Sequence, residues 1–368
     1  MQIEDNITAV LYRAGDLRLE KRPISEPKDD EVLLKICVVG ICGSDLHLVN
    51  DGRIGPKIVD KPAVLGKYGV AVEFHLTHIL GHEVSGIVWK VGNNVLNLKK
   101  GDRVAVDPGV HCFRCDPCRS GRGNLCVNAV FAGTLQSDGC LSRYFAHSAD
   151  FCYRLPDHVS LEEGALVELV SVAIHACKQG RVGHGSVVLV QGAGPVGLMS
   201  LLVSKALGAS KVLVTDYIQA RLDKAKEIGA DFIVQVHPRD SADVVKQKVI
   251  SALGGDPTTS IDCVGSELTI TVAVRATASG GVAVIVGFHG LPAVNIPITE
   301  AVIREIDIRG NHHYNNYDYH EALEMVATGT IDVKPLITHH YKIDEVQKAF
   351  NTATTREDNA IKVLIHTD

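Results

Sequence analysis

The sequence lacks three features that would place the chain in a membrane, in an export pathway or on nucleic acid. No apolar run approaches the ~20 residues that a membrane-spanning helix needs. Residues 1–5 are acidic and contain no apolar core, so they do not resemble a secretory signal. The net charge is −6, which argues against the basic face that nucleic acid or an anionic membrane surface attracts. We therefore expect a cytoplasmic protein with no nucleic-acid partner and no membrane partner.

The length and the cysteine content narrow the class of protein. The chain has 368 residues, which is too long for one small core and predicts two domains. It contains ten cysteines. In a reducing compartment, this number indicates metal binding or catalysis rather than disulfide bonds.

Residues 187–216 carry the pattern of a dinucleotide-binding turn. A short apolar strand leads into Gly192, Gly194 and Gly197 at G-x-G-x-x-G spacing, and a helical segment follows up to residue 208. A second apolar strand then ends at Asp216, where a carboxylate can accept hydrogen bonds from the ribose hydroxyls of an adenosine. A glycine triplet alone is usually only a turn, but here all parts occur in order. Because a carboxylate repels a 2′-phosphate, the pattern favours NAD over NADP.

The segments around this turn indicate an α/β fold with two domains. Strand-like and helix-like segments alternate through residues 161–297, which predicts a doubly wound parallel sheet that binds NAD. Residues 1–160 indicate a mostly β domain, and residues 298–368 are expected to return to it.

Four cysteines lie close together in a loop-rich stretch of the first domain. Cys112, Cys115, Cys118 and Cys126 are separated by Asp, Pro, Arg and Gly residues that cannot build a core. Four thiolates at this spacing are typical of a closed, structural zinc site. The alternatives are an iron–sulfur cluster and reduced free thiols.

A second set of metal-ligand residue types is spread along the first domain. Cys42 lies between glycine-containing turns, and His82 and Glu83 follow Gly81. Together they could supply the open, three-ligand site of a catalytic zinc, although a lone cysteine is more often a small buried hydrophobe. His82 and Glu83 are adjacent, so either the chain turns there or one of them acts indirectly. Glu168, among apolar residues of a predicted helix, could face solvent or act at the metal.

With these motifs the chain resembles the zinc-dependent medium-chain dehydrogenases, and within them the sorbitol (L-iditol) 2-dehydrogenase and insect ketose reductase branch. The resemblance covers almost the whole chain. It implies a GroES-like catalytic domain, a Rossmann domain, a homotetramer, and a catalytic zinc surrounded by Cys42, His82 and Glu83, with Glu168 reaching it directly or through water. The resemblance also implies that NAD is contacted by Val196, Asp216, Arg221, Val286, Gly287, Phe288 and His313.

The resemblance implies an NAD-dependent oxidation of polyols, in which sorbitol is converted to fructose and xylitol is a further substrate. A zinc ion lowers the pKa of a bound hydroxyl, which favours hydride transfer to the nicotinamide. Ser44 and His47 could relay the released proton to solvent, although His47 could equally be a surface histidine.

The chain departs from the family pattern at positions expected to contact substrate. Leu48 replaces an aromatic residue, and the family's Phe-Arg-Tyr is replaced by His312, His313 and Tyr314. Leu48, His313 and Tyr314 are therefore candidate substrate residues with altered specificity. Two alternatives remain open: a dehydrogenase of another secondary alcohol such as threonine, and a catalytically impaired cofactor-binding homologue.

An unusual segment, residues 66–80, precedes His82. Val64-Leu65 is echoed by Ile79-Leu80, and removal of residues 66–80 restores the uninterrupted family pattern. One hypothesis is a short translated intron, and the other is a genuine surface loop in which His75 and His78 are solvated.

Overall fold

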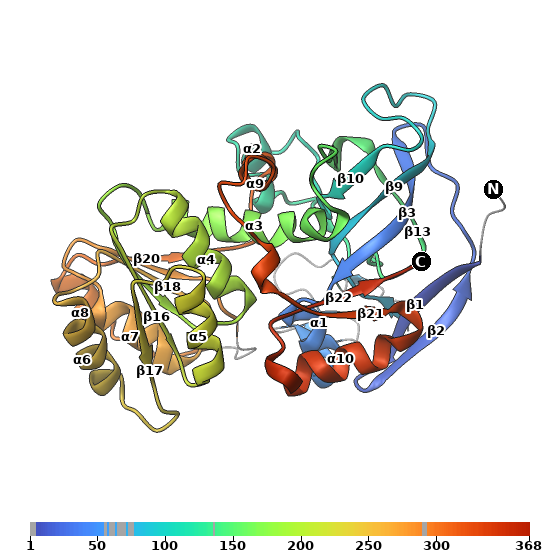
Figure 1. Cartoon of the computed structure of the whole chain (residues 1–368). Helices are drawn as coiled ribbons and strands as arrows, with labels where there is room; N and C mark the ends of the chain where they lie inside the picture. The colour runs from blue at the N-terminus through green and yellow to red at the C-terminus, as the bar shows by residue number, and fades with distance from the viewer. Residues whose placement is uncertain are drawn as a thin grey trace. The chain divides into compact units, whose positions relative to one another are not determined.

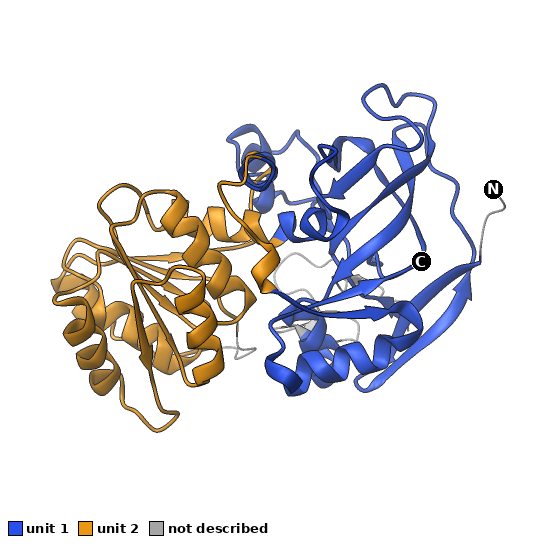
Figure 2. Ribbon diagram, viewed as in Figure 1, with its two compact units in different colours: residues 1–168, 319–327, 337–368 blue, residues 169–318, 328–336 orange. Residues whose placement is uncertain are grey.

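The computed structural model describes residues 5–54, 57–58, 63–64, 71–72, 77–134, 137–288 and 293–368. The chain divides into two compact units (Figure 2). The first contains residues 1–168, 319–327 and 337–368, and the second contains residues 169–318 and 328–336. The second unit is therefore inserted into the first.

Among the described residues, the first unit is built on a seven-stranded sheet in which six strands follow one path and β13 pairs with β3 (Figure 1). The strands in path order are β14 (Cys152–Arg154), β10 (Arg103–Val106), β9 (Glu83–Val91), β3 (Glu31–Gly40), β22 (Lys362–His366) and β21 (Ile337–Lys342), with β13 at Tyr144–Ser148. A smaller sheet joins β1 (Asn6–Arg13), β2 (Asp16–Arg22) and β8 (His78–Ile79). The C-terminal strand β22 thus lies beside β3, more than 300 residues away in the chain.

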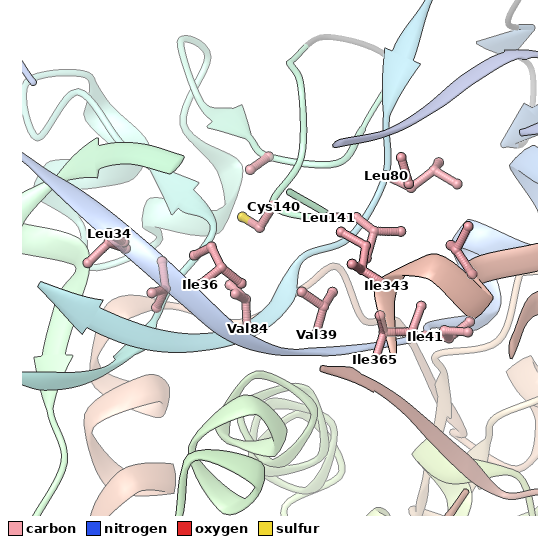
Figure 3. Close-up of a cluster of buried hydrophobic side chains, with 14 of the residues drawn as sticks. Leu34, Ile36, Val39, Ile41, Leu80, Val84, Cys140, Leu141, Ile343 and Ile365 are labelled. Carbon is pink, nitrogen blue, oxygen red and sulfur yellow. The ribbon is translucent and has the colours of Figure 1, made fainter. Parts of the chain in front are cut away.

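The core of the first unit is formed by the apolar side chains of these strands and of helix α10 (Val346–Thr355). Figure 3 shows side chains from distant segments meeting there, including Ile36, Leu80 and Ile365. Each is fully buried, so the apolar faces of β3 and β22 leave water together. This packing fixes the chain segments that carry Cys42 and His82.

The second unit contains a parallel sheet whose order within the described residues is β17-β16-β15-β18-β19-β20. The bounds are β17 (Phe232–Gln235), β16 (Lys211–Asp216), β15 (Val187–Gln191), β18 (Thr259–Asp262), β19 (Val282–Ile285) and β20 (Asp307–Gly310). Its connecting helices are α4 (Pro195–Ala206), α5 (Gln219–Glu227), α6 (Ala242–Leu253) and α7 (Glu267–Ala276), with α4 and α5 on one face and α6 and α7 on the other (Figure 1). In chain order this is the 3-2-1-4-5-6 arrangement of a Rossmann sheet, which confirms the predicted fold class.

The boundary of the second unit lies further along the chain than the predicted residue 297. Residues 298–318 belong to the second unit, because β20 pairs with β19 of the parallel sheet and α8 (Ile298–Ile303) leads into β20. Helix α9 (Asn316–Ala327) then begins the return to the first unit. Helix α3 (Leu161–Gln179) crosses between units at residue 168, not at residue 160.

The short strand β8 changes the interpretation of the unusual segment. Most of residues 66–76 lie outside the described residues, so the intron hypothesis stays a hypothesis. His78, predicted to be solvated, is only 6% exposed because β8 pairs with β1. Separately, no helix among the described residues combines the length and apolar character needed to cross a bilayer.

Candidate functional site

Cys42 lies at the start of helix α1 (Gly43–Asp51), immediately after the core strand β3. Its backbone N–H donates to Asp45 Oδ2 at 3.0 Å, so the side chain of the buried Asp45 caps the first turn of the helix. The other oxygen of Asp45 accepts the Gly81 N–H at 3.2 Å and lies 3.7 Å from His82 Nδ1. Asp45 therefore connects the two segments that carry Cys42 and His82. Sequence reasoning missed Asp45, although an acid three positions after Cys42 was an available signal.

The chain turns at Gly81, which resolves the problem posed by the adjacent His82 and Glu83. Gly81 has φ +90°, a backbone conformation that favours glycine, and a Cβ there would lie 2.9 Å from Val39. His82 precedes β9, whereas Glu83 is its first residue. Ligand atoms of Cys42, His82 and Glu83 all lie within 4.8 Å of one another. The structure thus brings together the three predicted zinc ligands.

The donor set of this cluster fits a zinc ion. It combines a thiol, an imidazole and a carboxylate, which are the ligand types of catalytic zinc sites. His82 is 6% exposed, and its Nδ1 has no hydrogen-bond partner among the described residues. Such a buried polar atom is costly unless something else satisfies it. Cys42, His82 and Glu83 are the residues that could hold the ion.

Glu83 is fully buried and forms an ion pair with Lys362 of β22. The Lys362 Nζ donates to both carboxylate oxygens, at 2.8 and 2.7 Å, and to the Ile41 carbonyl at 3.0 Å. Burial opposes the charge on Lys362, but the Glu83 carboxylate raises its pKa. A Cβ at Gly40 would lie 2.2 Å from Glu83 Oε2, so only glycine leaves room for this carboxylate. Lys362 was missed because nothing in its local sequence links it to a residue 279 positions earlier.

Two buried groups in this region have shifted pKa values. Burial opposes charging of the His82 imidazole, yet the nearby charges of Asp45 and Cys42 raise its pKa well above the usual value. Burial raises the pKa of Glu168 to about 8, and the negative charge of Glu83 adds to this effect. Glu168 therefore does not face solvent, being 3% exposed, but it is not part of the closely spaced ligand group.

The remaining residues that we assigned to this site differ in their surroundings. The Oγ of Ser44 lies 3.5 Å from His82 Nε2. His47 is 43% exposed, and its Nδ1 lies 3.2 Å from Asp51 on the same helix. Leu48 is completely buried in the apolar core, because it faces inward from α1. We therefore withdraw the assignment of Leu48 to substrate contact, since it has no exposed surface to offer.

The four cysteines of the loop-rich lobe converge as the spacing predicted. The sulfur atoms of Cys112, Cys115, Cys118 and Cys126 all lie within 4.8 Å of one another. Backbone N–H groups of Cys112 and Asn128 donate to Cys126 Sγ, each at 3.4 Å. Backbone N–H donors also lower the pKa of Cys112 to about 6, whereas burial raises that of Cys118 to about 12. Four sulfur ligands in this geometry fit a closed zinc site.

The glycine turn of the second unit has the shape of a phosphate cradle. Gly192 has φ +89°, Gly194 is the N-terminal cap of α4, and a Cβ at Gly197 would lie only 1.8 Å from the Gly192 carbonyl oxygen. The N-terminus of α4 follows at Pro195 and Val196, where the helix dipole favours an anion.

Asp216 ends β16 beside this turn, as predicted. Its Oδ2 accepts the Ala193 N–H at 2.7 Å, and its Oδ1 accepts the Ile218 N–H at 2.9 Å. These bonds orient the carboxylate at the carboxyl end of the sheet, where Rossmann folds bind their cofactor. Arg221, on α5, reaches the turn, since its Nη1 lies 3.7 Å from the position of a Cβ on Gly194.

The segment after β19 is held by the backbone carbonyl of Asp262, a buried residue that sequence reasoning missed. The N–H groups of Val286 and Gly287 donate to the Asp262 carbonyl at 2.9 and 2.8 Å, and Phe288 is 54% exposed. The Asp262 side chain accepts the Val264 N–H, and burial raises its pKa to about 6. The sequence signal for Asp262 is its place at the end of a strand.

His312 and His313, which stand in place of the family's Phe-Arg, and the unchanged Tyr314 lie in the second unit. His313 has φ +47°, which is uncommon for a residue other than glycine, and its ring contacts His312 with centroids 4.2 Å apart. Tyr314 is 2% exposed. Their roles toward cofactor and substrate stay predictions.

Comparison with known proteins identifies the family. Residues 28–157 match the model of the alcohol dehydrogenase GroES-like domain, and residues 195–328 match that of the zinc-binding dehydrogenases. Mouse sorbitol dehydrogenase is 46% identical over 364 residues, which are 99% of this chain and 96% of the mouse protein. The human sorbitol dehydrogenase is 44% identical with the same coverage.

Solved structures agree in fold. An Escherichia coli oxidoreductase of unknown specificity has a TM-score of 0.86 at 32% identity, covering 99% of this chain and 100% of its own. An Escherichia coli alcohol dehydrogenase complexed with NADH has a TM-score of 0.86 at 27% identity, covering 98% and 99%. Together with the two metal-ligand clusters, these similarities confirm the resemblance drawn from the motifs: the chain belongs to the zinc-dependent medium-chain dehydrogenase family and is similar to sorbitol dehydrogenases over its whole length.

Proposed function

We propose that this protein is an NAD-dependent polyol dehydrogenase that interconverts sorbitol and fructose and also accepts xylitol. The observation that carries the proposal is the convergence of Cys42, His82 and Glu83 in a chain that matches sorbitol dehydrogenases at 44–46% identity. When bound there, a zinc ion lowers the pKa of a substrate hydroxyl. Hydride passes from the carbinol carbon to C4 of the nicotinamide, and the hydroxyl proton leaves for solvent.

The residues of the chain have separate tasks in this proposal. Asp45 holds the two segments of Cys42 and His82 in place, and Lys362 orients the Glu83 carboxylate through both oxygens. Glu83 is the direct carboxylate ligand, because its oxygen lies in the ligand group. Glu168 lies outside that group and would act on the ion through water. Ser44 takes the first step of proton release, since its hydroxyl lies beside His82.

NAD is the proposed coenzyme. Asp216 is fixed at the carboxyl end of β16 by two backbone N–H donors, so a 2′-phosphate would meet a carboxylate that cannot swing away. The similar Escherichia coli alcohol dehydrogenase holds NADH, which supports a nicotinamide coenzyme on this sheet.

A turnover assay tests the proposal. Purified protein is supplied with sorbitol, xylitol or threonine and with NAD or NADP, and NADH or NADPH absorbance is followed. We expect NADH formation from sorbitol and xylitol, its loss in C42S, and its retention in C37S, a matched control on β3 whose thiol lies outside the site. Reduction of NAD by threonine, but not by sorbitol or xylitol, would favour the second candidate, a dehydrogenase of another secondary alcohol. The observation behind this candidate is His313, which stands in place of the family's arginine.

We further propose that the protein is a cytoplasmic homotetramer. Helix α8 carries exposed apolar side chains at Ile298, Val302 and Ile303, and β20 is an edge strand of the parallel sheet in the part of the chain that the structure describes. An unpaired sheet edge and an apolar patch favour association between copies. All ten cysteines are free, which fits a reducing compartment. Light scattering on the eluted protein tests the assembly: a monomer would contradict it.

A further inference from the structure

A third cluster of metal-ligand residues lies on the first unit, outside the residues described above. It consists of Glu162 in the first turn of α3, His340 on β21 and His366 on β22. Their side chains are 36%, 49% and 28% exposed. None of the three residues belongs to the Cys42 cluster or to the four-cysteine lobe.

The three ligand atoms form a nearly equilateral triangle. His340 Nδ1 lies 3.3 Å from Glu162 Oε1, His366 Nε2 lies 3.4 Å from the same oxygen, and the two nitrogens are 3.2 Å apart. Tetrahedral zinc has bonds of about 2.0–2.2 Å to nitrogen and oxygen, so neighbouring ligand atoms lie roughly 3.3–3.6 Å apart. The triangle therefore closely approaches one face of a zinc tetrahedron.

The backbone holds these side chains in place without a metal. β21 and β22 pair in parallel, with Tyr341 opposite Ile365 and Lys342 opposite His366. The two imidazole rings stack at 28° with centroids 5.5 Å apart. The start of α3 is fixed by the mutual hydrogen bonds of Ser160 and Glu163. The backbone positions of all three residues are therefore set before a cation binds, which lowers the entropic cost of forming the site.

The chemistry of the cluster selects the kind of cation. Two neutral imidazoles and one carboxylate carry a net charge of −1, which attracts a dication. Imidazole nitrogen suits Zn²⁺, Cu²⁺ and Ni²⁺, whereas Mg²⁺ and Ca²⁺ prefer oxygen ligands. Because the side chains are partly exposed, the fourth coordination position faces water.

We propose that Glu162, His340 and His366 form a third metal site that binds a divalent transition-metal ion such as Zn²⁺. The bound ion links β21 and β22 to the start of α3, all within the first unit. It takes no part in the polyol reaction, so its occupancy adds stability and leaves turnover unchanged.

Isothermal titration of the enzyme, with its other zinc sites filled, tests the site with ZnCl₂ as the probe. We expect one further equivalent to bind to the natural protein, and binding to weaken by at least about tenfold in H340Q, H366Q and E162Q, since even residues behind metal ligands contribute that much. The matched control is H339Q, which removes the neighbouring histidine of β21; His339 is not in the cluster. Its zinc affinity should equal that of the natural protein.

The variants change partly exposed side chains, and their far-UV circular dichroism reports that they are folded. Failure of the natural protein to bind the further equivalent would overturn the proposal. So would binding that is unchanged in H340Q and H366Q, or that is lost equally in H339Q. None of these outcomes depends on which alcohol the enzyme oxidises, so the site can fail while the proposed function stands.

Discussion

Replacing Lys362 with methionine tests the electrostatic design of the zinc site most severely. Lys362 is 1% exposed and Glu83 is completely buried, so in zinc-depleted protein, in which the comparison is made, the variant leaves a buried carboxylate without its cation. Two charge-assisted hydrogen bonds, of 2.7 and 2.8 Å, disappear together. Removing one partner of a buried ion pair costs about 3–5 kcal/mol, far more than removing an exposed pair.

Urea unfolding followed by tryptophan fluorescence measures this loss. Trp89 is the one tryptophan of the chain and lies on β9 of the first unit, so its emission reports that unit. With an m-value of about 2–3 kcal/mol/M, a loss of about 3–5 kcal/mol lowers the urea midpoint by roughly 1–2.5 M. K348M is the matched control, because the Lys348 side chain on α10 is 68% exposed. Its midpoint should move by less than about 0.5 M, since exposed pairs contribute at most ~1 kcal/mol.

The double variant E83Q/K362M separates the charge from the packing. It leaves no buried charge at this position, so it should recover part of the stability that K362M loses. If K362M unfolds at the same urea concentration as K348M, or if the double variant is no more stable than K362M, the reasoning is wrong.

Three further predictions follow from particular residues. In zinc-depleted protein, Glu168 has a pKa of about 8 in the folded state and an ordinary pKa of 4.5 in the unfolded state, so between these pH values only the folded state holds the proton. The free energy of unfolding should therefore fall as the pH rises from about 4.5 to 8. The variant E168Q should flatten this slope, because it removes the titrating group. D216S removes the carboxylate that opposes a 2′-phosphate, so the ratio of kcat/KM for NADP to that for NAD should rise at least about tenfold; an unchanged ratio would place the selectivity elsewhere. Deletion of residues 66–80 puts Leu65 in the place of the buried Leu80 and Val64 in the place of Ile79. The deletion should therefore lower the free energy of unfolding by only about 0.5–1.5 kcal/mol and keep turnover. Loss of soluble, active protein would show that the segment is a required part of the chain.

The features predicted well from sequence are those whose signals are local. Gly192, Gly194, Gly197 and Asp216 fall within one strand–turn–helix–strand unit, and the structure places them together at the carboxyl edge of the sheet. The four cysteines of the lobe likewise lie within fifteen positions of the sequence. Their convergence needed no knowledge of the tertiary fold.

The features missed depend on contacts between distant segments. The ion pair of Lys362 with Glu83 exists because β22 lies beside β3, and nothing near Lys362 in sequence indicates this. Leu48 was assigned to substrate by family position, but α1 turns it into the core. The inclusion of β20 in the parallel sheet could not be read from its short, partly polar sequence.

Zinc content of H82A compared with the natural protein tests the central claim most directly. After passage over a chelating resin that removes weakly held surface ions, the natural protein should retain two zinc ions per chain and reduce NAD with sorbitol. H82A should retain one ion, in the four-cysteine lobe, and form no NADH. An H82A protein that keeps both ions, or that still oxidises sorbitol at the natural rate, would contradict a catalytic zinc held by Cys42, His82 and Glu83.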